Sequence, residues 1–195
     1  MDARSTRIAL LAVAIVLGFL LRENPFSTRA ALDLEGPASL AASVAASAAV
    51  AAIFVFYTRF ARKKWAFAQR LASDLVTRAT GMRPLSIVLV AASASLGEEI
   101  LFRGVLVLWC GIALSSIAFG ALHLRSGWAW AASASIFGAA LGAVFVLTGS
   151  LAGPLLAHFA VDALALFVAS QSQPSDRPVE MNGLLGAVRA SKRGS

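Results

Sequence analysis

Long apolar runs, interrupted by very few charges, constrain this chain more than any other feature of its sequence. Such runs cover about residues 6–21, 38–58, 84–124, 127–147 and 151–170. A helix needs about 20 apolar residues to cross the hydrocarbon of a bilayer, so the run 84–124 is long enough for two spans. The sequence therefore predicts an all-α fold, a polytopic transmembrane helix bundle of about six spans.

The composition supports a membrane protein and argues against several other classes. The 195 residues are 58% hydrophobic and 14% charged, whereas a soluble domain carries about 25% charged residues. We therefore interpret the net charge of +7 as membrane topology and contact with membrane lipids, and we expect no nucleic-acid partner. The single cysteine, Cys110, excludes an intrachain disulfide and a multi-cysteine metal site.

The breaks between the runs carry local signals. The first run has the basic start of a signal peptide, but no small-residue cleavage site follows it, so we favour a retained span. Gly36–Pro37 opens the second run. Between Trp65 and Arg83, apolar residues recur at helical spacing among charges, which predicts an amphipathic helix in the membrane interface. We expect the run 84–124 to break near Cys110–Gly111.

The distribution of Lys and Arg predicts the orientation. With six spans, the amino terminus, the basic segment 59–83 and the tail fall on one side, which the positive-inside rule assigns to the cytoplasm. We expect a bacterial inner-membrane protein with both termini cytoplasmic. Its divisions would be two spans with a basic interfacial segment (1–83), a four-helix core (84–170) and a flexible basic tail (171–195).

Three ionisable residues lie deep within the third run: Glu98, Glu99 and Arg103. Charges at that depth cost several kcal/mol each on the milder scales, so they normally serve a function. Glu99 and Arg103 have the i, i+4 spacing of an ion pair with the acid on the amino-terminal side. Glu98 points about 100° away on a helix and is left uncommitted. It could act as a general base towards water.

The two histidines of the chain lie in later apolar runs, His123 near the end of one and His158 within another. Asp162 shares a helix face with His158 and could set the tautomer and orientation of its imidazole. Each feature alone has a structural explanation, as an ion pair, an interfacial histidine or a hydrogen bond between helices. Their accumulation in helices with few other charges favours one joint site.

Three motifs in order make a family resemblance specific. They are Glu-Glu-x-x-x-Arg (98–103), Phe-x-x-x-His (119–123) and His-x-x-x-Asp (158–162), on successive hydrophobic helices. This pattern resembles the CPBP family, the CAAX-protease and bacteriocin-processing or Abi-type intramembrane proteases. The resemblance covers about residues 84–170, the catalytic four-helix core of that family. The catalytic residues that it implies are Glu98, Glu99, Arg103, His123, His158 and Asp162.

The resemblance implies an intramembrane endopeptidase in which Glu98 activates water with help from His123, while Arg103 holds Glu99. His158 and residue 162 would stabilise the oxyanion of the tetrahedral intermediate. Here position 162 is Asp, where the family frequently has Asn. An ionised Asp cannot donate a hydrogen bond to an oxyanion, so it would be protonated or would orient His158.

The sequence favours chemistry without a cofactor. Zinc held by Glu98, His123 and His158 is the alternative. It is less favoured because the chain lacks a His-Glu-x-x-His arrangement and because Glu99 has Arg103 as a partner.

The expected substrate is a membrane-anchored protein or peptide, cleaved in carboxy-terminal processing, sorting or peptide maturation. The main alternative is a non-catalytic membrane immunity or scaffold protein of the same fold. A proton-coupled transporter would also use buried Glu and His. It is disfavoured by the short chain and by the lack of an inverted repeat.

Overall fold

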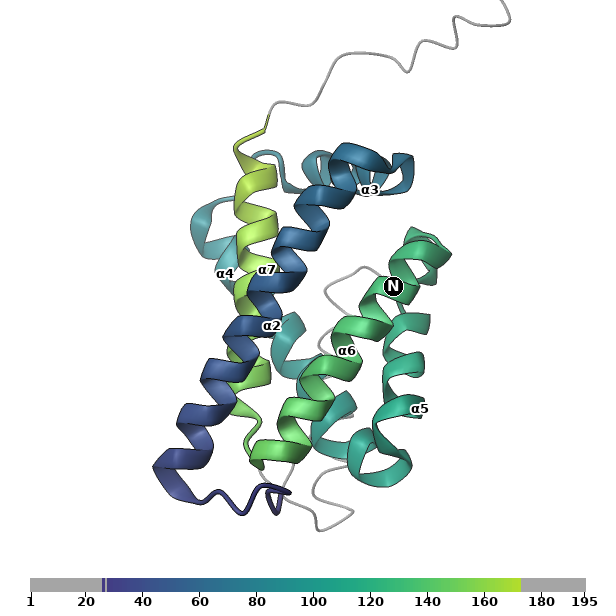
Figure 1. Cartoon of the computed structure of the whole chain (residues 1–195). Coiled ribbons are helices and arrows are strands. Elements are labelled where there is room, and N and C mark those ends of the chain that lie inside the picture. The colour runs from purple at the N-terminus through teal and green to yellow at the C-terminus, as the bar shows by residue number, and fades with distance from the viewer. Residues whose placement is uncertain (1–25, 27, 173–195) are drawn as a thin grey trace, which may run out of the picture.

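The computed structural model describes residue 26 and residues 28–172, and the elements of this part are helices (Figure 1). They are α2 (Gly36–Lys64), α3 (Ala66–Ala79), α4 (Pro84–Glu99), the π-helix η1 (Ile100–Leu106), α5 (Val107–Ala121), the 3₁₀-helix η2 (Leu124–Ser126), α6 (Trp128–Thr148) and α7 (Ala152–Ser170). The predicted all-α fold is confirmed.

The ends of the first helices follow from local sequence. Pro37 and Pro84 lie in the first turns of α2 and α4, where the missing proline N–H leaves no helical bond unmade. Trp65 has extended backbone angles and separates α2 from α3. The helix predicted between Trp65 and Arg83 is therefore present as α3, which lies across the ends of α2 and α7 (Figure 1).

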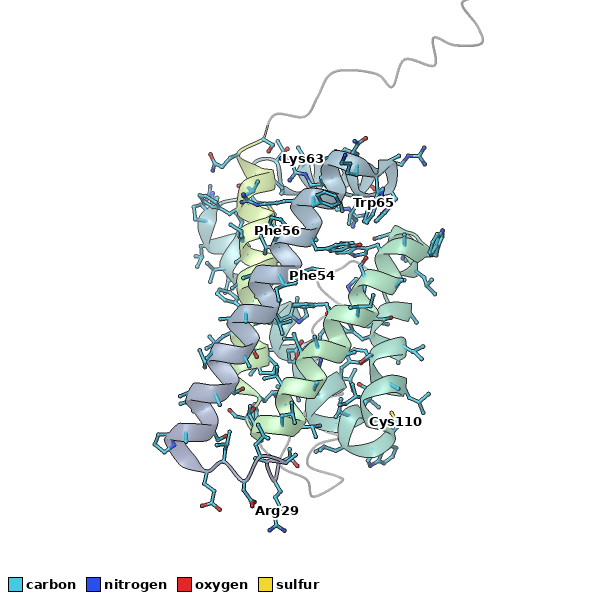
Figure 2. The ribbon with its side chains drawn as sticks, viewed as in Figure 1. Arg29, Phe54, Phe56, Lys63, Trp65 and Cys110 are labelled. Atoms are coloured by element: carbon cyan, nitrogen blue, oxygen red, sulfur yellow. The ribbon has the colours of Figure 1, made fainter. Side chains whose placement is uncertain are left out.

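The chain reverses direction at Gly111, where the break was expected. Gly111 has φ +79° and ψ 169°, a combination that is accessible almost only to glycine. The hydroxyl of Ser115 donates a hydrogen bond of 2.6 Å to the carbonyl of Phe102, thirteen residues earlier. Those residues would be about 20 Å apart along a straight helix. Figure 2 labels Cys110, which is next to this turn in the sequence. Cys110 lies at the end of the bundle opposite Lys63 and Trp65.

In the described residues, four helical stretches are long and apolar enough to cross a membrane: Gly36–Lys64, Pro84–Ala121, Trp128–Thr148 and Ala152–Ser170. Pro84–Ala121 includes the reversal, and its returning leg, residues 112–121, is only about 15 Å long, half the hydrocarbon thickness. The span predicted at residues 6–21 and the tail from residue 173 lie outside the described residues. The predicted count of six spans is not confirmed, whereas the multi-pass helix bundle is.

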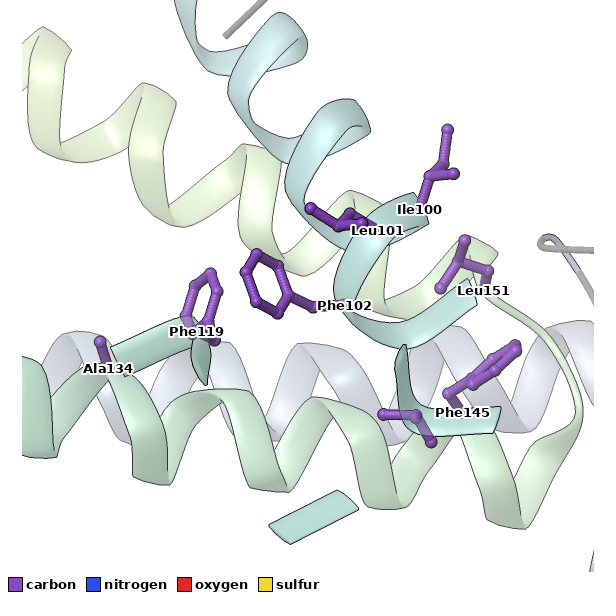
Figure 3. Packing of buried hydrophobic residues seen from close by; sticks show 8 residues of the cluster. Ile100, Leu101, Phe102, Phe119, Ala134, Phe145 and Leu151 are labelled. Atoms are coloured by element: carbon purple, nitrogen blue, oxygen red, sulfur yellow. The ribbon is translucent and has the colours of Figure 1, made fainter. Parts of the chain in front are cut away.

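One apolar cluster holds the returning chain against the bundle (Figure 3). Its buried members come from η1, α5, α6 and the start of α7: Ile100, Leu101, Phe102, Val107, Phe119, Ala134, Phe145 and Leu151. Because η1 contributes three consecutive residues, the segment that follows the paired glutamates is packed on several sides. The cluster therefore fixes the position of the charged residues next to it.

Candidate active site

The predicted ion pair between Glu99 and Arg103 is present and fully buried. Arg103 Nη1 lies 2.9 Å from Glu99 Oε1, and the two side chains are 1% and 0% exposed. Arg103 belongs to η1, in which the amide of Val107 donates to the carbonyl of Phe102 five residues back. Such π-helical turns occur often at functional sites. The pair thus stands where α4 changes to a wider winding.

Glu99 also contacts His158. The imidazole Nδ1 lies 2.7 Å from Glu99 Oε1, so an ionised Glu99 accepts a hydrogen bond from Nδ1 and leaves Nε2 on the other side of the ring. Asp162 was predicted as the group that orients His158, but its Oδ2 lies 3.7 Å from Nε2, beyond hydrogen-bond range. Glu99 takes that position because the packing of α4 against α7 brings its carboxylate closer than one helical turn brings Asp162.

The Nε2 atom of His158 faces two further carboxylates. Glu98 Oε2 lies 3.8 Å away and Asp162 Oδ2 lies 3.7 Å away. The exposed fraction of the side chains rises from 0% for Glu99 to 6% for His158, 15% for Glu98 and 36% for Asp162. The site therefore has a sealed side at the Glu99–Arg103 pair and an accessible side at Asp162.

His123 reaches the cluster from the end of α5. Its Nδ1 lies 3.0 Å from the carbonyl oxygen of Phe119. A carbonyl can only accept, so Nδ1 donates and Nε2 is left free. The imidazole is half-buried, and its ring centroid lies 5.0 Å from that of Phe119. His123 is thereby joined to the site through Phe119, whose ring also contacts that of His158.

Two phenylalanines wall the imidazole of His158. Phe119 and Phe137 both meet its ring edge to face, with centroid distances of 5.8 and 5.9 Å. The guanidinium of Arg103 lies 4.4 Å from the centroid of the Phe119 ring, a cation–π contact. The aromatic side chains hold the ring and keep water from the buried face of the site.

Phe137 and Gly138 of α6 are site residues that the sequence did not indicate. A Cβ atom added to Gly138 would lie 3.0 Å from both Arg103 Nη2 and a ring carbon of Phe119. Because glycine has no side chain, Arg103 and Phe119 can pack directly against α6 at this position. A glycine and a phenylalanine in an apolar helix carry no sequence signal, because neither residue breaks the hydrophobic pattern.

The donors proposed for zinc are not gathered into a metal site in the part of the chain that the structure describes. The described residues contain no group of three or more His, Cys, Asp or Glu placed to hold a metal ion. A structural zinc site requires four ligands and a catalytic site three. We derive no step through a metal.

The motif-bearing part of the chain matches a known family. Residues 80–164 match the family described as type II CAAX prenyl endopeptidase Rce1-like. This part of the chain is similar to the Rce1-like family. The match confirms the resemblance predicted from the motifs, and all six predicted site residues fall within the Rce1-like segment. The match suggests the fold of a CAAX-type intramembrane protease for these residues, and members of the Rce1-like family are generally proteases.

One curated protein is similar to part of the chain. A stretch of 80 residues is 36% identical to the uncharacterized protein YpbD of Bacillus subtilis (strain 168), and covers 40% of this chain and 42% of that protein. The chain therefore spans less than half the length of this curated relative. No solved structure matches the chain.

Proposed function

We propose that this protein is an intramembrane endopeptidase that hydrolyses peptide bonds of membrane-anchored protein or peptide substrates by water activated at Glu98, without a metal. One observation carries the proposal. Of the adjacent glutamates, Glu99 is held by both Arg103 and His158, whereas Glu98 lies 3.8 Å from its neighbour His158 Nε2. A carboxylate that makes no hydrogen-bonded ion pair can accept a proton from water.

The other residues would support that step. Water bound between Glu98 and His123 would attack the scissile carbonyl carbon while Glu98 takes its proton. The oxyanion would form near His158 Nε2, which can donate a hydrogen bond to it when protonated. Arg103 and Glu99 would keep the imidazole in place from the sealed side. In this scheme Glu98, His158, Glu99 and Arg103 each have one role.

The decisive experiment replaces the proposed base. New peptide termini would be compared by mass spectrometry in membranes that contain the wild type, Glu98→Gln or Glu35→Gln at matched levels. Glu35 is exposed and precedes α2, so its variant is a matched control. We expect termini produced by the wild type and Glu35→Gln to fall at least about 100-fold with Glu98→Gln. Equal sets of termini in all three would favour the immunity or scaffold role instead.

We also propose that the protein lies in the inner membrane with both termini in the cytoplasm. The supporting observation is the basic end of α2, Arg62 to Lys64, which lies opposite the turn at Cys110 (Figure 2). Positive charge marks the cytoplasmic side. The exposed Cys110 should then react with a membrane-impermeant maleimide added to spheroplasts, and Cys110→Ser serves as the blank. Labelling only after membrane disruption would contradict this orientation.

A further inference from the structure

Asp162 is the group whose position the proposed mechanism leaves without a task. It is the most accessible of the carboxylates in the site, with 36% of its side chain exposed. Glu99, not Asp162, makes the short contact that orients His158. As a carboxylate, it cannot serve as the amide donor that an Asn would be at this position. A carboxylic acid at an accessible place in a hydrolytic site can instead deliver a proton.

We propose that Asp162 is the catalytic acid of this site and protonates the leaving amine of the scissile peptide bond, while Glu98 is the base. This inference rests on the proposed function. It gives the two carboxylates that face His158 Nε2 opposite roles, with Glu98 receiving a proton and Asp162 donating one. Paired carboxylates with divided roles are an established solution for hydrolysis.

The geometry allows one peptide unit to contact both groups. The Glu98 and Asp162 oxygens lie 3.8 and 3.7 Å from the same nitrogen. They are therefore no further apart than the sum of these distances. Two other groups of the site are poor donors to an amine, since Glu99 is sealed at 0% exposure and the guanidinium of Arg103 does not release its proton. His158 Nε2 is assigned to the oxyanion.

The reaction balances with these two groups. The water oxygen forms a bond to the carbonyl carbon, and its proton passes to Glu98. The tetrahedral intermediate then breaks its C–N bond as Asp162 gives its proton to the nitrogen, which leaves as an amine. The proton on Glu98 finally returns to Asp162 by way of His158 Nε2, which lies between them. One water is consumed, and an acid and an amine are released.

The test changes the leaving group. The probe is a synthetic quenched-fluorescence peptide with a Leu/Ala membrane span, selected as one that the purified wild type cleaves in lipid vesicles. A second probe replaces the scissile amide of this peptide by an ester, whose alkoxide leaving group needs protonation far less. We expect Asp162→Asn to cleave the amide at least about 100-fold more slowly than the wild type. Its rate on the ester should stay within a few-fold.

Three further variants make the result decisive. Glu98→Gln should lose both activities, Asp162→Glu should recover part of the amide cleavage, and Asp74→Asn, an exposed change on α3, should alter neither. If Asp162→Asn does not fold, the contrast between probes is measured with Asp162→Glu, whose displaced acid should slow amide more than ester cleavage.

Equal losses of Asp162→Asn on amide and ester would show a structural role and overturn the assignment. Unchanged amide cleavage by Asp162→Asn would overturn it as well. In either case, loss of both activities in Glu98→Gln would leave the proposed function standing. If the wild type cleaved no peptide at all in the selection step, the proposed function itself would fail, and this inference with it.

Discussion

Helix α2 and the reversing segment Pro84–Ala121 are similarly apolar in sequence but differ in what they contact. Half of the most apolar window of Pro84–Ala121 is buried in the protein, compared with 11% of that of α2. The reversing segment carries the buried Glu99 and Arg103, whereas the buried residues of α2 are Ser43, Ser47 and Ala61. Hydropathy thus identifies a membrane helix, but it does not distinguish a helix that faces lipid from one that builds a site.

The two regions are held in place by different means. The reversing segment depends on large side chains and an ion pair, while α2 approaches α7 through small residues. The Ser43 hydroxyl donates to the carbonyl of Ser150 at 2.8 Å and accepts from the amide of Gly153 at 3.2 Å. Small residues at such a contact let helix backbones come close in a membrane. The regions should therefore respond differently to substitution.

The largest effect on stability is expected for Arg103→Ala. It removes the cation from a fully buried pair and leaves Glu99 without its guanidinium, which should lower the free energy of unfolding by about 3–5 kcal/mol. The measurement is an SDS titration of the purified protein in detergent micelles. Arg70→Ala, at an exposed position of α3, is the control. Wild-type stability of Arg103→Ala would show that the pair does not hold the reversing segment.

A smaller effect is expected for Gly153→Ala. The added Cβ would overlap the backbone carbonyl of Ser43, and backbone cannot move aside as a side chain can. The overlap should push α2 away from α7 and lower the free energy of unfolding by about 1–3 kcal/mol in the same titration. Gly142→Ala is the matched control, because the nearest atom to its added Cβ is a side-chain carbon of Ile112 at 3.4 Å. Equal stability of the two variants would mean that the α2–α7 contact is adaptable.

The smallest effect is expected for Phe56→Ala on the outer face of α2. Phe56 is 73% exposed, so in a membrane its ring contacts lipid in the folded and in the unfolded protein alike. We expect a change within about 0.5 kcal/mol in the free energy of unfolding. Phe119→Ala is the counterpart, since Phe119 is 2% exposed and should cost about 3–5 kcal/mol. A comparable loss at Phe56 would indicate that a further segment packs on this face of α2.

Several features could be predicted because they depend on residues close together in the chain. The helix start at Gly36–Pro37, the break at Gly111 and the ion pair between Glu99 and Arg103 are of this kind. Proline geometry, glycine conformations and i, i+4 spacing act within one or two turns. The motif order that resembles the Rce1-like family is likewise a property of the chain alone.

The tertiary structure decided which of these groups meet. His158 and Glu99 are 59 residues apart, yet they form the short contact that was assigned to Asp162 four residues away. Gly138 gives space to Arg103 and Phe119, and η1 winds as a π-helix without a signal in its sequence. The amino-acid sequence determined that apolar helices carry a few costly charges. Because those charges must find partners where water is excluded, the packing of the helices determined the pairs.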